Sequence, residues 1–177
     1  MDHRLIAPRA GILIAARDFS APPETVWGFW TKADQRAQWL AGGEDIVAPD
    51  RPVNFVFDRA QHGVPISSET GEAEGVARVE GYVSAFERPT VLGLELRGSG
   101  SMATTLTVSL RGRDDGHTDL RLVHERVPKD ELVQAAAGWH AHLDLLLACL
   151  EGSPPPDFTK RFAQLLEGYQ EDPPGTE

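Results

Sequence analysis

The chain has 177 residues, 41% hydrophobic and 25% charged, which is typical of one globular domain rather than a disordered segment. Its net charge of −10 argues against nucleic acid as a partner, because phosphate backbones repel an acidic surface. No apolar run approaches the roughly eighteen residues of a membrane-spanning helix. Arg4, Arg9 and Arg17 interrupt any signal-peptide pattern, and Cys149 is the single cysteine. We therefore expect a cytoplasmic protein with no membrane partner and no disulfide.

The first aromatic-rich segment predicts a strand followed by two short helices. We expect residues 1–10 to be loose and residues 11–19 to form a strand. Two prolines then favour the start of a helix. One strand face and one helix face are predicted to be apolar; they comprise Leu13, Ala15 and Phe19, and then Val26, Phe29, Trp30 and Ala33.

A second short helix is predicted over residues 32–40. Thr31 and Asp34 have the spacing of a capping pair, and Gly42–Gly43 would end the helix.

Alternating apolar residues predict five further strands, with one dry face and one wet face as in antiparallel sheets. Their ranges are 52–58, 75–86, 90–96, 102–112 and 117–126. The sequence DDG at 114–116 is a hairpin signal. The polar loop at 59–74 is long for a hairpin, and we interpret it either as a flexible connection or as the edge of a lid.

The second aromatic-rich segment predicts one long helix that begins near Asp130 and ends at Gly152. Its apolar stripe comprises Leu132, Ala136, Trp139, Leu143, Leu146 or Leu147, and Leu150. A further amphipathic helix is predicted over 157–169, with Asp157 as its N-cap and a loose tail after it. The stripe of this helix packs either on the chain's own sheet or long helix, or on a second copy in a homodimer.

Four motifs, in this order, resemble one known family. They are RDFSAPPETVWGFWTKADQRAQWL, GYVSAFERPTVLGLEL, GHTDLRLVHERVP and AAGWHAHLDLLLACLEG. The pattern is similar to the START-like, or Bet v 1-like (SRPBCC), superfamily, and within it to bacterial proteins related to the activator of the heat-shock chaperone ATPase. The resemblance implies an α+β helix-grip fold, in which a curved six-stranded antiparallel sheet surrounds the long helix. It covers residues 11–152, and residues 153–177 form an extension outside it.

A curved sheet around one helix favours an apolar interior, and large aromatic side chains suit such a space. We expect this interior either to bind a hydrophobic small molecule or to be an ordinary core. The candidate lining residues are Trp30, Trp39, Phe55, Phe57, Leu92, Leu94, Leu106, Val108, Leu122, His124, Trp139 and Leu143.

His124 is the one titratable residue that the alternation of its strand directs inward. It is either a donor or a base toward a ligand, which makes it the single, weak catalytic candidate, or a strand-end residue bonded to the backbone. Arg17 either binds an acidic head group or pairs with one of the carboxylates Glu80, Glu95 and Glu125.

The sequence offers no metal site or cofactor motif. His140 and His142 point to different sides of a helix, so only His140 and Asp144 are expected to meet. No phosphate-binding glycine loop or nucleophile elbow is present. We expect Cys149 to be a small buried hydrophobe.

Three functions are consistent with these features of the sequence. The preferred one is a non-enzymatic protein that binds a hydrophobic or amphipathic small molecule. The alternatives are an enzyme of the cyclase, dehydratase or hydrolase kind that uses His124, and a module that regulates a chaperone ATPase. For the last, the resemblance implies a further N-terminal domain, which we do not expect here.

Overall fold

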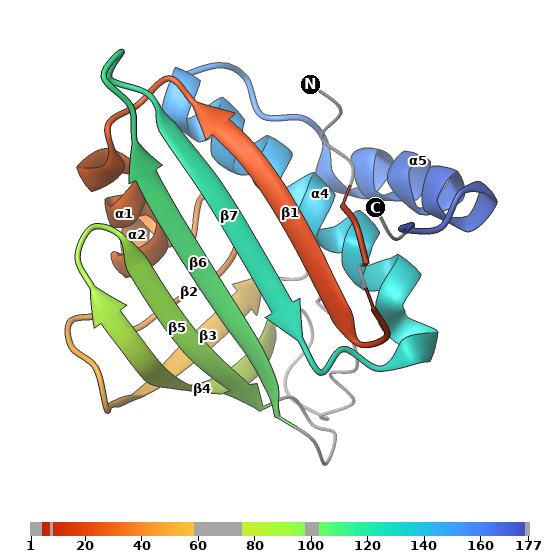
Figure 1. Cartoon of the computed structure of the whole chain (residues 1–177), viewed down its shortest axis with the longest axis horizontal. Coiled ribbons are helices and arrows are strands. Elements are labelled where there is room, and N and C mark those ends of the chain that lie inside the picture. The colour runs from red at the N-terminus through yellow and green to blue at the C-terminus, as the bar shows by residue number, and fades with distance from the viewer. Residues whose placement is uncertain (1–4, 8, 59–75, 98–102, 176–177) are drawn as a thin grey trace.

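The computed structural model describes residues 5–7, 9–58, 76–97 and 103–175, and these form an α+β fold (Figure 1). The strands are β1 (Ile12–Phe19), β2 (Gly42–Gly43), β3 (Pro52–Asp58), β4 (Val76–Glu87), β5 (Val91–Arg97), β6 (Thr104–Gly112) and β7 (Thr118–Glu125). The helices are α1 (Pro23–Thr31), α2 (Ala33–Arg36), α4 (Leu132–Glu151) and α5 (Phe158–Glu171), with a 3₁₀ turn η1 (Lys129–Glu131) leading into α4. The predicted strands are confirmed to within about two residues at their ends.

The sheet has seven strands, all antiparallel to their neighbours, in the order β1-β7-β6-β5-β4-β3-β2. The prediction of six strands was wrong, because Gly42 and Gly43 do not simply end a helix. They pair with Val56 and Phe55 at the edge of the sheet. Two glycines carry no alternation of apolar side chains, so no pattern in the sequence indicates this strand.

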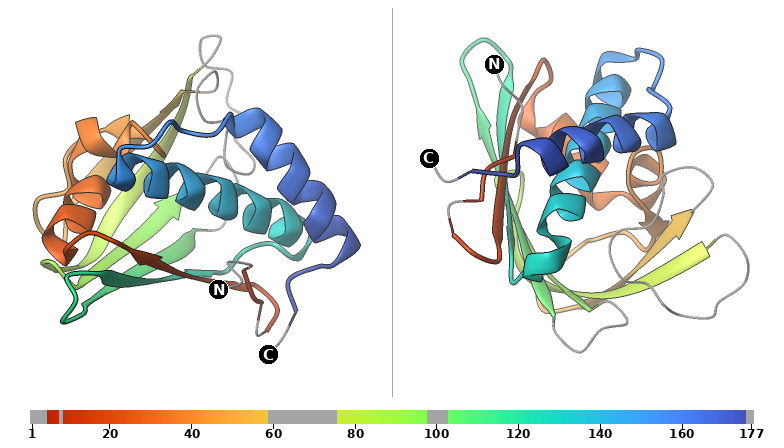
Figure 2. Two further views of the ribbon diagram at one scale, coloured as in Figure 1. Left: turned by 90° about the horizontal axis from the view of Figure 1, so that it is seen from above. Right: turned by 90° about the vertical axis from the view of Figure 1, so that its right-hand side faces the viewer.

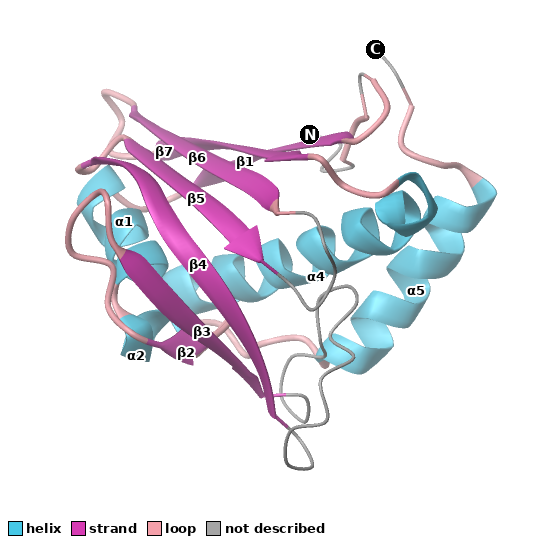
Figure 3. Ribbon diagram, turned by 90° about the horizontal axis from the view of Figure 1, so that it is seen from below, coloured by secondary structure: helices cyan, strands magenta, loops and turns pink. Residues whose placement is uncertain are grey.

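The sheet curves around α4, as the three ribbon views show (Figures 1, 2 and 3). Figures 2 and 3 show α4 running along the inner face, and among the strands β1 has the most extensive contact with α4. The predicted inward side chains of β1, β3, β6 and β7 are all buried. The core therefore lies between one sheet face and α4, as a helix-grip arrangement requires.

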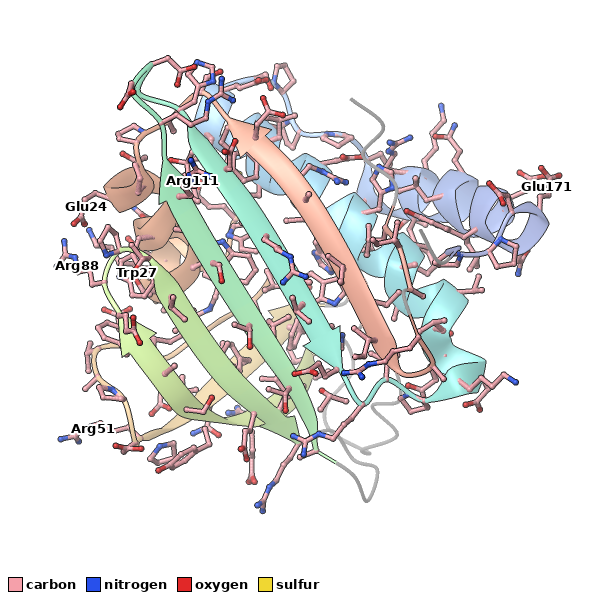
Figure 4. The ribbon with its side chains drawn as sticks, in the orientation of Figure 1. Glu24, Trp27, Arg51, Arg88, Arg111 and Glu171 are labelled. Carbon is pink, nitrogen blue, oxygen red and sulfur yellow. The ribbon has the colours of Figure 1, made fainter. Side chains whose placement is uncertain are left out.

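The two short helices close one end of this space. In α1 the buried side chains are Val26, Trp27 and Trp30, whereas Phe29, which we predicted to be buried, is partly exposed. The ring of Trp27 makes an edge contact with Phe86 of β4, at 5.2 Å between ring centroids. Figure 4 shows Trp27 at this end of the sheet, near Glu24 and Arg88, which form an exposed ion pair of 2.9 Å. The buried face of α1 therefore includes Trp27 in place of Phe29, because α1 packs against the end of the sheet at Phe86 as well as against the interior.

The predicted capping pair of α2 does not form. The hydroxyl of Thr31 donates instead to the carbonyl of Trp27 in α1, at 2.8 Å. The first N–H of α2, from Ala33, donates to Asp45 at 2.7 Å, a residue that follows the helix in sequence. α2 ends at Arg36, so it is shorter than the predicted range 32–40.

The C-terminal helices form as predicted. Gly152 ends α4 with φ of 65°, a left-handed conformation that glycine adopts without steric cost. The carboxylate of Asp157 accepts the N–H of Lys160 at 2.9 Å, which confirms the predicted N-cap of α5. α5 packs on α4, and the apolar stripe of α5 contacts the core through Phe158, Phe162, Leu165 and Leu166.

The segment before β1 is not loose where the structure describes it. Leu5 is buried, and Ile6 exchanges two backbone hydrogen bonds with Ile14 of β1. The N–H of Ala7 donates to the carbonyl of Gly175 at 3.1 Å. Leu5 and Ala7 explain this, because both are buried and lie on the same side of the extended segment, next to the dry face of the sheet edge. The loop at 59–74, interpreted above either as a flexible connection or as the edge of a lid, lies outside the described residues.

Candidate functional site

The register of the sheet aligns the predicted inward side chains in two rows across four strands. In the first row, Leu94, Leu106, His124 and Leu13 lie opposite one another in turn. The second row is made by Leu92, Val108, Leu122 and Ala15. All eight side chains are buried. His124, in the first row, is thus the one polar side chain among these eight residues.

Opposite these rows, Trp139 of α4 is the centre of a group of rings that we call the Trp139 cluster: Trp30, Trp39, His124 and Trp139. The ring centroid of Trp139 lies 6.3 Å from that of Trp30 and 6.0 Å from that of His124. Trp30 in turn makes an edge contact of 4.7 Å with Trp39. The cluster therefore joins α1, the turn after α2, β7 and α4. Trp139 is partly exposed, while the other three rings are buried.

His124 is held in one tautomer by its neighbour on α4. The indole N–H of Trp139 donates to Nδ1 of His124 at 3.0 Å. Nδ1 must therefore carry a lone pair, and in the neutral ring the hydrogen is on Nε2. Burial lowers the pKa of His124 to about 4, since its neighbours across the sheet are two leucines. At neutral pH the ring is uncharged and offers an Nε2–H donor.

Two N–H donors of the cluster are buried without a hydrogen-bond partner in the part of the chain that the structure describes. They are Nε2 of His124 and Nε1 of Trp30. The side chains are only 7% and 1% exposed, so bulk solvent does not reach these atoms freely. The other two indoles of the cluster do have acceptors. Nε1 of Trp39 donates to the carbonyl of Phe29 at 2.9 Å, and Nε1 of Trp139 donates to His124. Each buried donor without a partner costs about 1–3 kcal/mol, and native proteins contain few of them.

The remaining predicted lining residues are placed as follows. Leu92, Leu94, Leu106, Val108, Leu122 and Leu143 are buried at the sheet–helix interface, and Trp30 and Trp39 complete the cluster. Phe55 and Phe57 are buried on β3, near the other edge of the sheet. The ring of Phe55 lies 4.9 Å from the guanidinium of Arg36 and covers Gly81, where an added Cβ would be 2.8 Å from the ring. The structure thus places Phe55 against Arg36 and Gly81 at the β3–β4 side of the core.

Arg36 is a structural centre that the sequence analysis missed. It is 1% exposed, and its guanidinium donates to five backbone carbonyls. The acceptors are the carbonyls of Trp30, Thr31, Ala41, Gly42 and Glu44. Burial lowers the pKa of Arg36 to about 10, and nearby Asp45 opposes this shift. Arg36 remains charged at neutral pH and links α1 to β2 beneath the cluster.

The other polar candidates have structural contacts. Arg17 is buried opposite Leu120, and its Nη1 donates to the carbonyl of Ala16 at 2.9 Å. His140 lies 3.9 Å from Asp144, the pair expected to meet, and its Nδ1 lies 3.1 Å from the Tyr169 hydroxyl.

His142, two residues after His140 on α4, points to a different side of the helix and has different partners. Nδ1 of His142 lies 2.8 Å from the carbonyl of Trp39, to which it donates. Cys149 is partly rather than fully buried, and burial raises the pKa of its thiol. Among the described residues, no three histidine, cysteine or acidic side chains come together as metal ligands. In the same part of the chain, no helix is long and apolar enough to cross a membrane.

A curved antiparallel sheet around a long C-terminal helix, with two short helices after the first strand, defines the helix-grip class of START-like proteins. Within this class, the chain belongs to the family described as "Activator of Hsp90 ATPase homolog 1-like protein", which matches residues 20–151. The resemblance of the sequence motifs to this family is thereby confirmed. No curated protein matches the chain.

Solved structures support the same fold. The protein BPP1335 from Bordetella parapertussis is 29% identical with a TM-score of 0.74, and the match covers 93% of this chain and 87% of that one. CalU16 from Micromonospora echinospora is 20% identical with a TM-score of 0.66, covering 90% and 86%. EF2215 from Enterococcus faecalis, described as a conserved protein of unknown function, is 16% identical with a TM-score of 0.62, covering 97% and 92%. The last two are similar in fold alone.

Proposed function

We propose that this protein binds a hydrophobic or amphipathic small molecule between the sheet and α4, beside Trp139, and that it does so without catalysing a reaction. The observation that supports this most directly is His124. Its imidazole lies in a row of leucines, is oriented by Trp139, and directs a donor without a partner into the interior. A polar atom kept at this cost in an apolar setting is typical of a ligand site, in which a few polar groups orient the bound molecule.

The same geometry makes His124 a poor acid–base catalyst. General acid–base groups work best when their pKa lies near the operating pH, and burial lowers the pKa of His124 to about 4. Nδ1 is already engaged with Trp139, and the partners of His124 across the sheet are Leu13 and Leu106. An enzyme of the cyclase, dehydratase or hydrolase kind would need a second titratable group in reach. We therefore favour binding over catalysis at this position.

The family description names an ATPase activator, and one fold hosts many activities. Our proposal for this chain rests on its interior rather than on that description. A cytoplasmic location is part of the proposal and rests on the single cysteine, which gives no disulfide framework. The acidic net charge of −10 supports a small-molecule partner over nucleic acid.

The proposal is tested with fluorene, a rigid apolar probe. Titration followed by NMR is expected to shift the side-chain resonances of Trp139 and Leu106, and calorimetry gives the affinity. Leu106→Phe, which adds volume next to His124, is expected to weaken binding about tenfold. Leu110→Phe is the matched control, because Leu110 lies on the same strand face but pairs with Leu120, away from His124.

Two results would contradict the proposal. One is the absence of saturable binding of both fluorene and its ketone, 9-fluorenone, at the limits of their solubility. The other is binding that Leu106→Phe and Leu110→Phe weaken to the same extent, which would place the probe elsewhere on the molecule. Native mass spectrometry of the gently purified protein, followed by solvent extraction, then identifies the compound that it carries from the cell.

A further inference from the structure

The two unpartnered donors of the Trp139 cluster limit what the bound molecule can be. Nε2–H of His124 and Nε1–H of Trp30 are both buried, and both belong to rings that contact Trp139. We infer that the ligand is an uncharged molecule with oxygen acceptors, such as a ketone, quinone, ester or ether, whose oxygens accept hydrogen bonds from these two donors. This inference rests on the proposed function and specifies the ligand class for the same site.

The direction of the hydrogen bonds follows from the cluster itself. Trp139 occupies the lone pair of His124 Nδ1, so the free nitrogen of His124 carries a hydrogen and donates. An indole nitrogen donates only, so Trp30 also requires an acceptor. The N–H groups of Trp39 and Trp139 are already satisfied by Phe29 and His124. The ring nitrogens of the cluster therefore offer two free donors and no free acceptor. A ligand hydroxyl at this position would accept a hydrogen bond through its oxygen and would not donate one to these rings.

The charges around the cluster favour a neutral acceptor over a carboxylate. His124 and Trp30 are both uncharged at neutral pH. The buried cation Arg36 donates to the backbone carbonyl of Trp30 and to four further carbonyls. Arg17 faces the same interior, but it lies opposite Leu120, outside the row of His124. A carboxylate bound at the cluster would lose its hydration and would receive only two hydrogen bonds from uncharged donors in return. Burying a charge with so little compensation is costly.

The inference is tested with two probes of the same shape, fluorene and 9-fluorenone, which differ by one carbonyl oxygen, with fluorene-9-carboxylate as the charged comparison. Calorimetry is expected to show fluorenone binding about tenfold more tightly than fluorene, and the carboxylate most weakly. The double variant Trp30→Phe/His124→Leu is expected to bind both neutral probes equally. His124→Gln retains a donor near the position of Nε2 and is expected to keep part of the preference. Trp27→Phe is a tryptophan control outside the cluster and is expected to keep all of it.

NMR of the unmodified protein gives a second measurement that does not depend on folding of a variant. Fluorenone, but not fluorene, is expected to move the indole N–H of Trp30 or the ring N–H of His124 downfield. The resonances are assigned through their contacts with the ring of Trp139. Either a preference that survives in the double variant, or equal binding of the two neutral probes with unchanged N–H shifts, would overturn the inference and leave the proposed function intact. Failure of every probe to bind would overturn both. Tightest binding of the carboxylate would show that the acceptor is charged and overturn the inference alone.

Discussion

The hydroxyl of Tyr169, on α5, accepts a hydrogen bond of 2.8 Å from the backbone N–H of Leu5, a residue 164 positions earlier in the chain. Both residues are 1% exposed, and the same hydroxyl lies 3.1 Å from Nδ1 of His140 on α4. One oxygen thus connects the edge of the sheet to both C-terminal helices. The ion pair between Arg161 and Asp144, at 2.7 Å, joins the same two helices nearby.

Tyr169→Phe is therefore expected to lower the free energy of unfolding by about 1–3 kcal/mol, because it leaves the buried N–H of Leu5 without an acceptor. Hydrogen exchange should accelerate at the Leu5 amide, while the amides of β6 remain protected. The ring itself is preserved, so the stability measured by urea unfolding reports the loss of the hydroxyl. Unchanged exchange at Leu5 would contradict this role.

Protonation of His124 is expected to make stability depend on pH. The pKa of His124 in the folded state, about 4, is below its ordinary value of about 6.5, so the unfolded chain binds the proton more readily. The stabilisation is complete above pH 6.5 and is lost as the pH falls toward 4, by about 3 kcal/mol in total. Urea unfolding at several pH values measures this slope. His124→Gln should have a shallower slope between pH 6.5 and 4, and an identical slope would refute the assignment.

Trp139→Phe removes the donor to Nδ1 of His124 but retains an aromatic ring. We expect a loss of about 1 kcal/mol in stability and a mixture of His124 tautomers in place of the single Nε2–H form. Long-range proton–nitrogen NMR spectra distinguish the two tautomers. Trp27→Phe serves as the control, since Trp27 contacts Phe86 instead and its substitution should leave the His124 spectrum unchanged. A single Nε2–H tautomer in Trp139→Phe would show that another group orients the ring.

Arg36→Lys keeps the charge but loses the planar fork that donates to five carbonyls. We expect a loss of about 3 kcal/mol or more, because several buried carbonyls lose a charged donor at once. Arg88→Lys is the matched control: its pair with Glu24 is exposed, and such pairs contribute less than about 1 kcal/mol. Equal losses in the two variants, measured by urea unfolding, would refute the structural role of Arg36.

Gly43→Ala is expected to disrupt the pairing of β2 with β3. Gly43 has φ of 102°, and an added Cβ would lie 2.0 Å from the carbonyl oxygen of Asn54. The cost should exceed about 2 kcal/mol, combining backbone strain with the clash. Gly168→Ala, within α5 and with open space around its Cβ, should instead stabilise the protein by about 0.5–1 kcal/mol. Thermal unfolding of the two variants provides the comparison.

Much of this fold follows from the periodicity of the sequence. The alternation in Val53, Phe55 and Phe57, and again in Leu120, Leu122 and His124, predicts both the strands and their buried faces. The inward direction of His124 needs nothing more than this alternation. The N-cap at Asp157 could also be predicted from the sequence, because it depends only on a hydrogen bond to the nearby N–H of Lys160.

The features that the sequence analysis missed depend on contacts between distant segments. Arg36 is charged and lies in a helix of four residues, so nothing local distinguishes it from a surface arginine. Its burial depends on the folded path of the chain after α2, which brings the carbonyls of Ala41, Gly42 and Glu44 to its guanidinium. Likewise, whether the indole N–H of Trp30 has an acceptor is decided by three-dimensional packing. The glycines that end the helix region gave no sign that they also add a strand.

Three of the four tryptophans are almost fully buried, and the fourth, Trp139, is partly exposed at the cluster. A collisional quencher such as acrylamide should therefore extinguish the emission of Trp139 first. The protein thus carries its own fluorescent reporter of what happens between sheet and helix, and occupancy of that space can be followed by light without attaching a label.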